Sequence, residues 1–198
     1  MPLQSLNKYL TRFNWIGITG GILTLIVIIV SIYYPWWQLT IGDAVTINVS
    51  PMNTNFGLLG TSFVIPLIYA LNIGSILTFL CSGILMLIYA VTPTKSYAKE
   101  LLDFAWRKPL YSVITSTVCL SLIVIIARSI FDMNIPLIGT ELVHLPAQFT
   151  EGVTITVLVT TAFQWPLYLA ITTATLCIIA KVYDKKVIQR QITNHKQP

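Results

Sequence analysis

The stretch Tyr33–Pro51, YYPWWQLTIGDAVTINVSP, joins two regions of different character. Before it the chain is almost wholly apolar, and from Trp37 onward apolar and polar residues alternate with the two-residue period of half-buried strands. A chain that leaves hydrocarbon must satisfy its backbone polar groups in a new way, and strand pairing does this. We therefore predict a membrane boundary near Pro35 and a β-hairpin over residues 36–50.

The apolar pattern, rather than the turn, predicts the register of this hairpin. Gly42-Asp43 suits a two-residue turn, but that turn would pair Leu39 with Thr46 and mix polar with apolar residues on each face. A three-residue loop ending at Ala44 separates the faces, and we expect an awkward backbone conformation at Ala44 as its cost. The apolar face would then carry Trp37, Leu39, Ile41, Val45, Ile47 and Val49, and the polar face Gln38, Thr40, Thr46 and Asn48.

Composition indicates an integral membrane protein. Of the 198 residues, 55% are hydrophobic and 10% are charged, whereas about 25% are charged in an average soluble domain. Four apolar segments approach the roughly 20 residues that an α-helix needs to cross about 30 Å of hydrocarbon. We predict one membrane domain over residues 1–198, a mainly α four-helix bundle with a small β-hairpin or three-stranded sheet outside the cytoplasm, and spans at residues 13–34, 66–92, 109–130 and 166–183.

Prolines and tryptophans mark the ends of these segments. Proline at the first position of a helix loses no hydrogen bond, so Pro66, Pro109 and Pro166 would open three spans and Pro35 would close the first. Tryptophan prefers the level of the lipid headgroups. Its positions near the predicted ends are Trp15, Trp36, Trp37, Trp106 and Trp165.

Basic residues predict the orientation. Of the 12 Lys and Arg residues, all but Arg128 fall before the first span, between spans two and three, or in and after the last turn of span four. Short basic segments stay in the cytoplasm, so we expect a multi-pass protein of the cell membrane with both termini cytoplasmic and the hairpin outside. The net charge of +5 then reflects contact with anionic lipid and does not indicate nucleic-acid binding.

Residues 152–161, GVTITVLVTT, predict a further strand outside the membrane. Their β-branched composition favours a strand, and a lone hairpin is marginal in water and needs partners. The alternative is one long helix, Val153–Tyr183, that protrudes from the bilayer.

Four spans, Pro35-Trp36-Trp37 after the first span and the hairpin that follows resemble the claudin-type four-helix architecture. The chain is also similar to small membrane proteins of thermophilic archaea with Pro-Trp-Trp at this place. The resemblance implies a role in adhesion, barrier formation or assembly. Claudins carry a disulfide in the first outer loop, whereas Cys81, Cys119 and Cys177 all lie in predicted spans, where we expect them to pack as small apolar side chains.

The sequence predicts no catalytic residue, no cofactor and no metal ion. No ionisable residue or histidine lies near the middle of a predicted span, where transporters, proton relays and haem enzymes usually hold them. Outside, His144 accompanies Asp43, Asp132, Glu141 and Glu151, but acidic outer loops follow from the topology and the spacing is not that of a zinc-enzyme motif. A membrane enzyme using His144 and Glu141 is therefore only the third candidate.

Small residues four apart predict close helix contacts, which would involve Gly17, Gly21, Gly74, Ser82, Ala170 and Ala174. Asn48-Val49-Ser50 matches the glycosylation sequon, which makes Asn48 a candidate acceptor.

The function that fits best is a non-enzymatic structural or accessory subunit. It would present an outer β surface to other membrane or cell-surface subunits of a membrane or envelope complex, in addition to its contacts with the lipid bilayer. The expected partner-binding residues are Trp36, Trp37, Leu39, Ile41, Val45, Ile47 and Val49. The alternative is an oligomeric channel or transporter for a small solute, lined by Thr115, Ser116, Thr172, Thr173 and Thr175.

Overall fold

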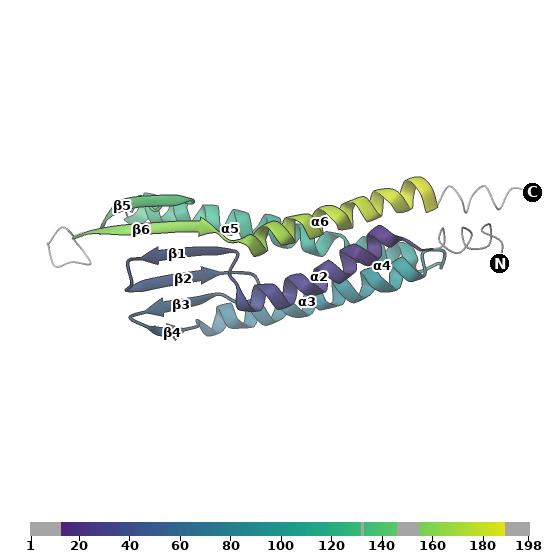
Figure 1. Ribbon diagram of the computed structural model, residues 1–198, viewed down its shortest axis with the longest axis horizontal. Coiled ribbons are helices and arrows are strands. Elements are labelled where there is room, and N and C mark those ends of the chain that lie inside the picture. The colour runs from purple at the N-terminus through teal and green to yellow at the C-terminus, as the bar shows by residue number, and fades with distance from the viewer. Residues whose placement is uncertain (1–12, 132, 146–154, 189–198) are drawn as a thin grey trace, which may run out of the picture. The chain divides into compact units, whose positions relative to one another are not determined.

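The computed structural model describes residues 13–131, 133–145 and 155–188. This part of the chain is mainly helical and contains one antiparallel sheet (Figure 1). The helices are α2 (Trp15–Tyr33), α3 (Pro66–Val91), the short α4 (Ala98–Ala105), α5 (Arg107–Phe131) and α6 (Trp165–Tyr183), followed by a π-helix, η2 (Asp184–Ile188). By length and composition, α2, α3, α6 and the α4–α5 segment are each capable of crossing a membrane.

The ends of the four long helices lie close to the predicted ends. α3 begins at Pro66, as predicted. α5 begins at Arg107, so Pro109 lies inside its first turn, where a backbone N–H has no acceptor within the helix in any case. Asn14 caps α2, because its Oδ1 accepts a hydrogen bond from the Gly17 N–H at 2.9 Å.

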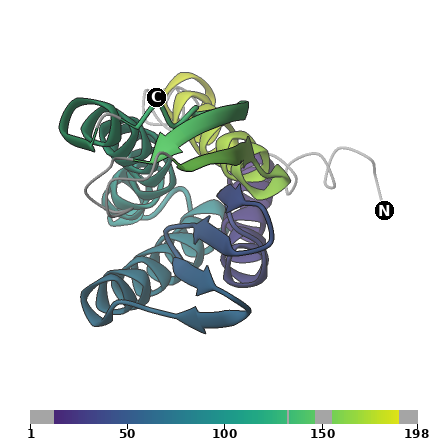
Figure 2. The ribbon, with the colours of Figure 1, turned by 90° about the vertical axis from the view of Figure 1, so that its left-hand side faces the viewer.

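The sheet has six strands in the order β4-β3-β2-β1-β6-β5. The strands are β1 (Trp37–Ile41), β2 (Val45–Val49), β3 (Asn55–Leu58), β4 (Thr61–Phe63), β5 (Gly139–Leu145) and β6 (Ile155–Phe163). The first four lie between α2 and α3 in the sequence, and the last two lie between α5 and α6. β1 pairs with both β2 and β6, so it joins these two parts of the chain into one sheet (Figure 2).

The β1–β2 hairpin has the predicted register, with Leu39 opposite Ile47 and Trp37 opposite Val49. The conformation expected at Ala44 is wrong. Gly42 adopts the left-handed conformation instead, with φ +49°, and Leu59 is the one described non-glycine residue with a positive φ. Glycine has no Cβ, so it takes this conformation at the start of the loop without a steric penalty.

A strand precedes α6, as predicted for residues 152–161, although residues 152–154 lie outside the described part of the chain. The alternative of one helix from Val153 is wrong over the described residues, because Ile155–Phe163 pairs with β1 and β5. Strands β3, β4 and β5 were not predicted. β3 and β4 are too short to show a clear period, and we infer that pairing with neighbouring strands stabilises them.

Two compact units make up the chain. The first, here the helical unit, comprises the described parts of residues 1–29, 76–113 and 169–198. The second, here the sheet unit, comprises those of residues 30–75 and 114–168.

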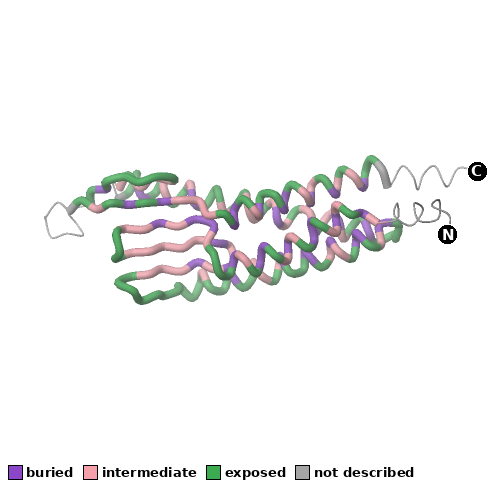
Figure 3. The backbone as a smooth tube through the Cα atoms, in the orientation of Figure 1, coloured by how far each residue is buried: buried purple, intermediate pink, exposed green. Residues whose placement is uncertain are grey.

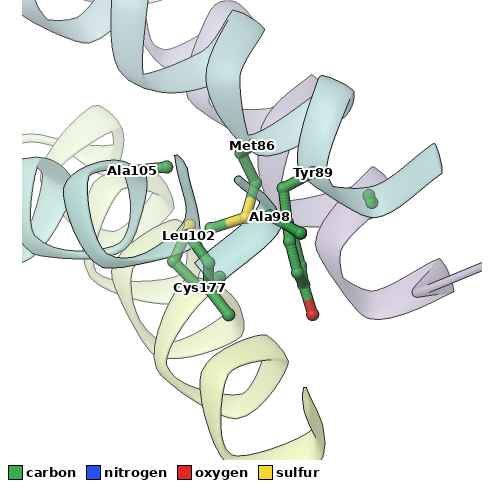
Figure 4. Close-up of a cluster of buried hydrophobic side chains, with 7 residues drawn as sticks. Met86, Tyr89, Ala98, Leu102, Ala105 and Cys177 are labelled. Carbon is green, nitrogen blue, oxygen red and sulfur yellow. The ribbon is translucent and has the colours of Figure 1, made fainter. Parts of the chain in front are cut away.

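In the helical unit, α4 packs through one apolar face. Ala98, Leu102 and Ala105 of α4 are buried in a cluster with side chains of α3 and α6, among them Met86 and Cys177 (Figure 4). Residues three and four apart lie on one face of a helix, so this spacing gives α4 a buried side and an outward side.

In the sheet unit, the core lies on the apolar face of the sheet. Trp37 and Leu39 of β1 pack with Val143 of β5, Val159 of β6 and Leu120 of α5. The connection that follows α5 adds further apolar side chains, from Met133, Ile135 and Leu137. The C-terminal part of α5, inside the predicted span 109–130, therefore contributes to the core of the sheet.

Candidate functional site

The first candidate site is the apolar face of the β1–β2 hairpin, which the sequence predicts to bind a partner. Trp36, Trp37 and Leu39 are only 1%, 3% and 4% exposed. The Trp36 indole N–H donates to Ser31 Oγ at 2.7 Å, and that of Trp37 donates to the Leu137 carbonyl at 2.9 Å. These three side chains therefore belong to the interior of the protein and do not form an open surface.

The remaining members of the predicted partner-binding set are half-buried. Ile41, Ile47 and Val49 pack against the core of the sheet unit, and Val45 is also half-buried. The alternation of apolar and polar residues along β1 and β2 thus largely reflects a core that side chains of α5 and β6 complete. Trp36 and Trp37 follow the end of α2 directly, and their rings are buried within the protein.

The chain is exposed at the β3–β4 turn (Figure 3), and several of the residues there are large and apolar. Leu58 is 48% exposed, Phe63 is 51% exposed, and Leu59 at 77% has the highest exposure among the described large apolar residues. Leu59 and Gly60 both have positive φ, +48° and +81°, which is the pattern of a type I′ turn.

Neither the turn conformation nor burial favours leucine at position 59. A type I′ turn favours Asn or Asp followed by Gly, and a left-handed conformation costs a residue with a bulky side chain roughly 1–2 kcal/mol. The side chain also gains nothing from burial. An unfavourable conformation combined with an exposed apolar side chain points to a functional surface. The sequence signal was Leu-Leu-Gly at positions 58–60, which does not fit the usual hairpin rules.

The polar face of the sheet carries a chain of side-chain amides. Asn48, the candidate glycosylation residue, is half-buried, and its Oδ1 and Nδ2 both form hydrogen bonds in this chain, so the folded strand does not present a free amide. The bonds run from Gln164 Nε2 to Gln38 Oε1 (3.4 Å), Gln38 Nε2 to Asn48 Oδ1 (3.1 Å), Asn48 Nδ2 to Asn55 Oδ1 (3.0 Å), Asn55 Nδ2 to Asn53 Oδ1 (3.3 Å) and Asn53 Nδ2 to the Ile32 carbonyl (2.7 Å).

His144 and Glu141, the residues of the enzyme alternative, have separate partners. His144 Nδ1 lies 2.9 Å from Thr156 Oγ1, and Glu141 Oε1 accepts a hydrogen bond from Asn134 Nδ2 at 2.7 Å. Among the described residues, no group of three or more His, Cys, Asp and Glu side chains is placed to hold a metal ion. Asp132 and Glu151, which the sequence places on the same side, lie outside the described residues.

A buried polar cluster in the helical unit was not predicted. Asn14 Nδ2 donates to Tyr89 Oη at 2.9 Å and to the Ala180 carbonyl at 3.1 Å, and Tyr89 Oη donates to Asp184 Oδ1 at 2.8 Å. All three side chains are buried. The cluster joins the start of α2 to the ends of α3 and α6, so it is suited to fixing three helix ends. Its one sequence signal is Asn14, a cap residue before an apolar run.

The predicted helix contacts are partly correct. A Cβ on Gly17 would lie 3.1 Å from Ala90 Cβ, and one on Gly21 would lie 2.8 Å from Leu87 Cγ, so both are close contacts of α2 with α3. A Cβ on Gly74 would meet no atom within 4 Å, so Gly74 is not a close-contact position.

The other predicted packing residues are buried, and two further glycines belong with them. Ser82 Oγ donates to the Ala105 carbonyl at 2.7 Å, which ties α3 to α4. Ala170 and Ala174 are buried on α6. A Cβ on Gly83 would lie 2.7 Å from Leu25 Cδ2, and one on Gly20 would lie 3.2 Å from Cys177 Sγ.

Two of the residues that would line a channel, Thr173 and Thr175, form hydrogen bonds within their own helix. Thr173 Oγ1 donates to the Leu169 carbonyl and Thr175 Oγ1 to the Ile171 carbonyl. Among the cysteines, Cys177 is buried, as expected, whereas Cys81 and Cys119 are exposed and do not pack inside the chain.

No family model, no curated protein and no solved structure compared with this chain matches it. A functional assignment therefore depends on the residues of the chain itself.

Proposed function

We propose that this chain is an integral protein of the cell membrane that crosses the bilayer four times, with both termini cytoplasmic and the sheet outside. It acts without catalysis, as a structural or accessory subunit that presents its sheet to a partner protein in a membrane or envelope complex.

The observation that carries the membrane location is the distribution of exposed side chains on the long helices. The middle turns expose large aliphatic side chains, such as Ile26, Leu77 and Ile123. So much exposed apolar surface is unfavourable in water and suits lipid. The exposed aromatic rings of these helices lie near the helix ends, where they fit the headgroup level: Trp15, Tyr33, Tyr69, Tyr111, Trp165 and Tyr168.

The distribution of charge supports the orientation. Of the described Lys and Arg residues, Arg128 alone belongs to the sheet unit, and the others belong to the helical unit. Asp43 and Glu141, by contrast, belong to the sheet unit. The positive-inside rule then assigns the basic unit to the cytoplasmic side.

Labelling of single cysteines in whole cells tests this topology. We expect the cysteine of Asp43→Cys to react with a membrane-impermeant maleimide in intact cells, and that of Lys186→Cys to react only after permeabilisation. The unmodified chain is the control, because its own cysteines lie on the apolar helices and should be shielded by lipid. If only the Lys186→Cys variant were labelled in intact cells, the orientation would be the opposite of the one proposed.

The β3–β4 turn supports the partner-binding part of the proposal. Leu58, Leu59 and Phe63 expose apolar surface there, and Phe63 stacks on Phe56 at a centroid distance of 5.6 Å, which holds its ring in place. A fixed aromatic ring beside an exposed leucine is the kind of anchor that a partner pocket accepts. We therefore assign partner binding to this turn and no longer to the apolar face of the β1–β2 hairpin.

Leu59→Asn separates binding from folding. Asparagine favours the left-handed conformation, so the free energy of unfolding should stay constant or rise by up to about 1 kcal/mol. Association with the partner should fall by about tenfold, because the exposed leucine is the anchor that we assign. Detergent unfolding and quantitative co-purification from mild detergent measure the two effects.

Leu142→Asn is the matched control, because Leu142 is an exposed leucine on β5, away from the turn. It should leave partner retention unchanged. Full retention by Leu59→Asn would refute the assignment of the turn. A strictly monomeric protein that purifies alone and supports solute flux in liposomes would favour the channel or transporter alternative.

A further inference from the structure

We propose that residues 97–108, here the α4–α5 elbow, form a binding surface for the phosphate headgroups of anionic phospholipids. This inference rests on the proposed membrane location and adds a ligand class to the cytoplasmic side.

The packing of α4 decides which side of the elbow faces outward. Ala98, Leu102 and Ala105 are buried against α3 and α6, and the hydrogen bond from Ser82 to the Ala105 carbonyl fixes the end of the helix. Pro109, one turn further on, is also buried. Lys99, Glu100, Phe104 and Arg107 are exposed and form the outward side of the elbow. Leu101 and Trp106 are half-buried and pack against the cluster.

This outward side combines exposed aromatic rings with cations. Tyr97 is 45% exposed and Phe104 is 41% exposed. The Lys108 ammonium lies 4.7 Å from the centroid of the Phe104 ring, and the Arg107 guanidinium carbon lies 5.7 Å from that of the Trp106 ring. Stacking holds both cations in place, so less side-chain entropy is lost when they bind an anion.

The charge of the elbow remains positive after its internal pairing. Asp103 forms an ion pair with Lys181, and this hydrogen bond lowers the pKa of the Asp103 carboxyl group. Asp103 is thus already neutralised by a lysine from α6. The other charged side chains within or beside the elbow are Glu100 and the four cations Lys95, Lys99, Arg107 and Lys108.

Rings and cations together favour lipid over a soluble anion. A solvated basic face needs no exposed tyrosine or phenylalanine, whereas aromatic side chains prefer the headgroup level and lysine and arginine near a membrane attract anionic lipid. In the α4–α5 elbow, aromatic and basic side chains occur together in one short segment, next to helices with exposed aliphatic surfaces.

Native mass spectrometry of the full chain in neutral detergent tests the inference. With equimolar phosphatidylglycerol and phosphatidylcholine of the same acyl chains, the protein should retain phosphatidylglycerol in excess. The double variant Arg107→Gln/Lys108→Gln should weaken phosphatidylglycerol retention about tenfold or more and leave phosphatidylcholine unchanged, because each cation near an anionic headgroup contributes several-fold.

Two variants serve as controls. Arg107→Lys/Lys108→Arg keeps both charges and should retain most of the binding. Lys185→Gln/Lys186→Gln removes two charges from η2 in the same unit and should have a several-fold smaller effect. Equal retention of the two lipids, or an equal loss in the η2 variant, would overturn the inference. Extraction of the protein from membranes by alkaline carbonate would instead refute the proposed membrane location.

Discussion

Gly83→Leu is expected to lower the free energy of unfolding by about 3 kcal/mol or more, enough to prevent stable folding. Gly83 lies where α3 meets α2, and even a Cβ there would lie 2.7 Å from Leu25 Cδ2 and 3.3 Å from the Gly21 carbonyl oxygen. The Leu25 side chain can change its conformation, but the Gly21 carbonyl oxygen can move only if α2 moves with it. The two helices would have to separate and lose the close packing that stabilises them.

Gly74→Leu is the matched control on the same helix. A Cβ at Gly74 would meet no atom within 4 Å, so leucine is accommodated and raises helix propensity by up to about 1 kcal/mol. Unfolding in mixed detergent micelles, followed by circular dichroism, compares the two variants. Equal stability of Gly83→Leu and Gly74→Leu would contradict the close approach of α2 and α3.

Trp36→Ala should destabilise the protein by about 3–5 kcal/mol, the usual cost of removing a large buried aromatic side chain. Trp36 is 1% exposed, and its indole N–H donates to Ser31, whose side chain is itself buried. Alanine would leave a cavity and also remove the partner of the Ser31 hydroxyl. If Trp36 served only to bind a partner, this variant would fold normally.

Trp165→Ala is the corresponding control, because Trp165 is half exposed and contacts Tyr34 at a centroid distance of 5.7 Å. One aromatic contact at a helix end contributes about 1 kcal/mol, so this variant should stay folded in detergent. Thermal unfolding of the two variants in one detergent gives the comparison. A smaller loss for Trp36→Ala than for Trp165→Ala would place Trp36 outside the core.

Local patterns in the sequence were sufficient to predict the four long helices and the register of the β1–β2 hairpin. Runs of apolar residues bounded by Pro66, Pro109 and Pro166 predict helices whose ends agree closely with the structure. The alternation from Trp37 to Val49 predicts the register of β1 with β2, because a slip by one residue would move every apolar side chain to the wrong face. These features depend on residues close together in the chain.

The role of each apolar residue was decided by tertiary contacts. The pattern shows that the β1–β2 face must be covered, but not by what, and the cover comes from α5 and β6, some 80 residues or more further along. Gly74 and Gly83 both lie on α3, and only the tertiary structure shows that Gly83 meets α2 whereas a Cβ at Gly74 would meet no atom within 4 Å. The left-handed backbone conformation of Leu59 likewise follows from the pairing of β3 with β4 and has no counterpart in the local sequence pattern. Sequence by itself determined which segments are helical or extended and which faces are apolar, since these follow from local periodicity. The tertiary structure alone decided which apolar faces are internal, because burial depends on segments that are distant in the chain.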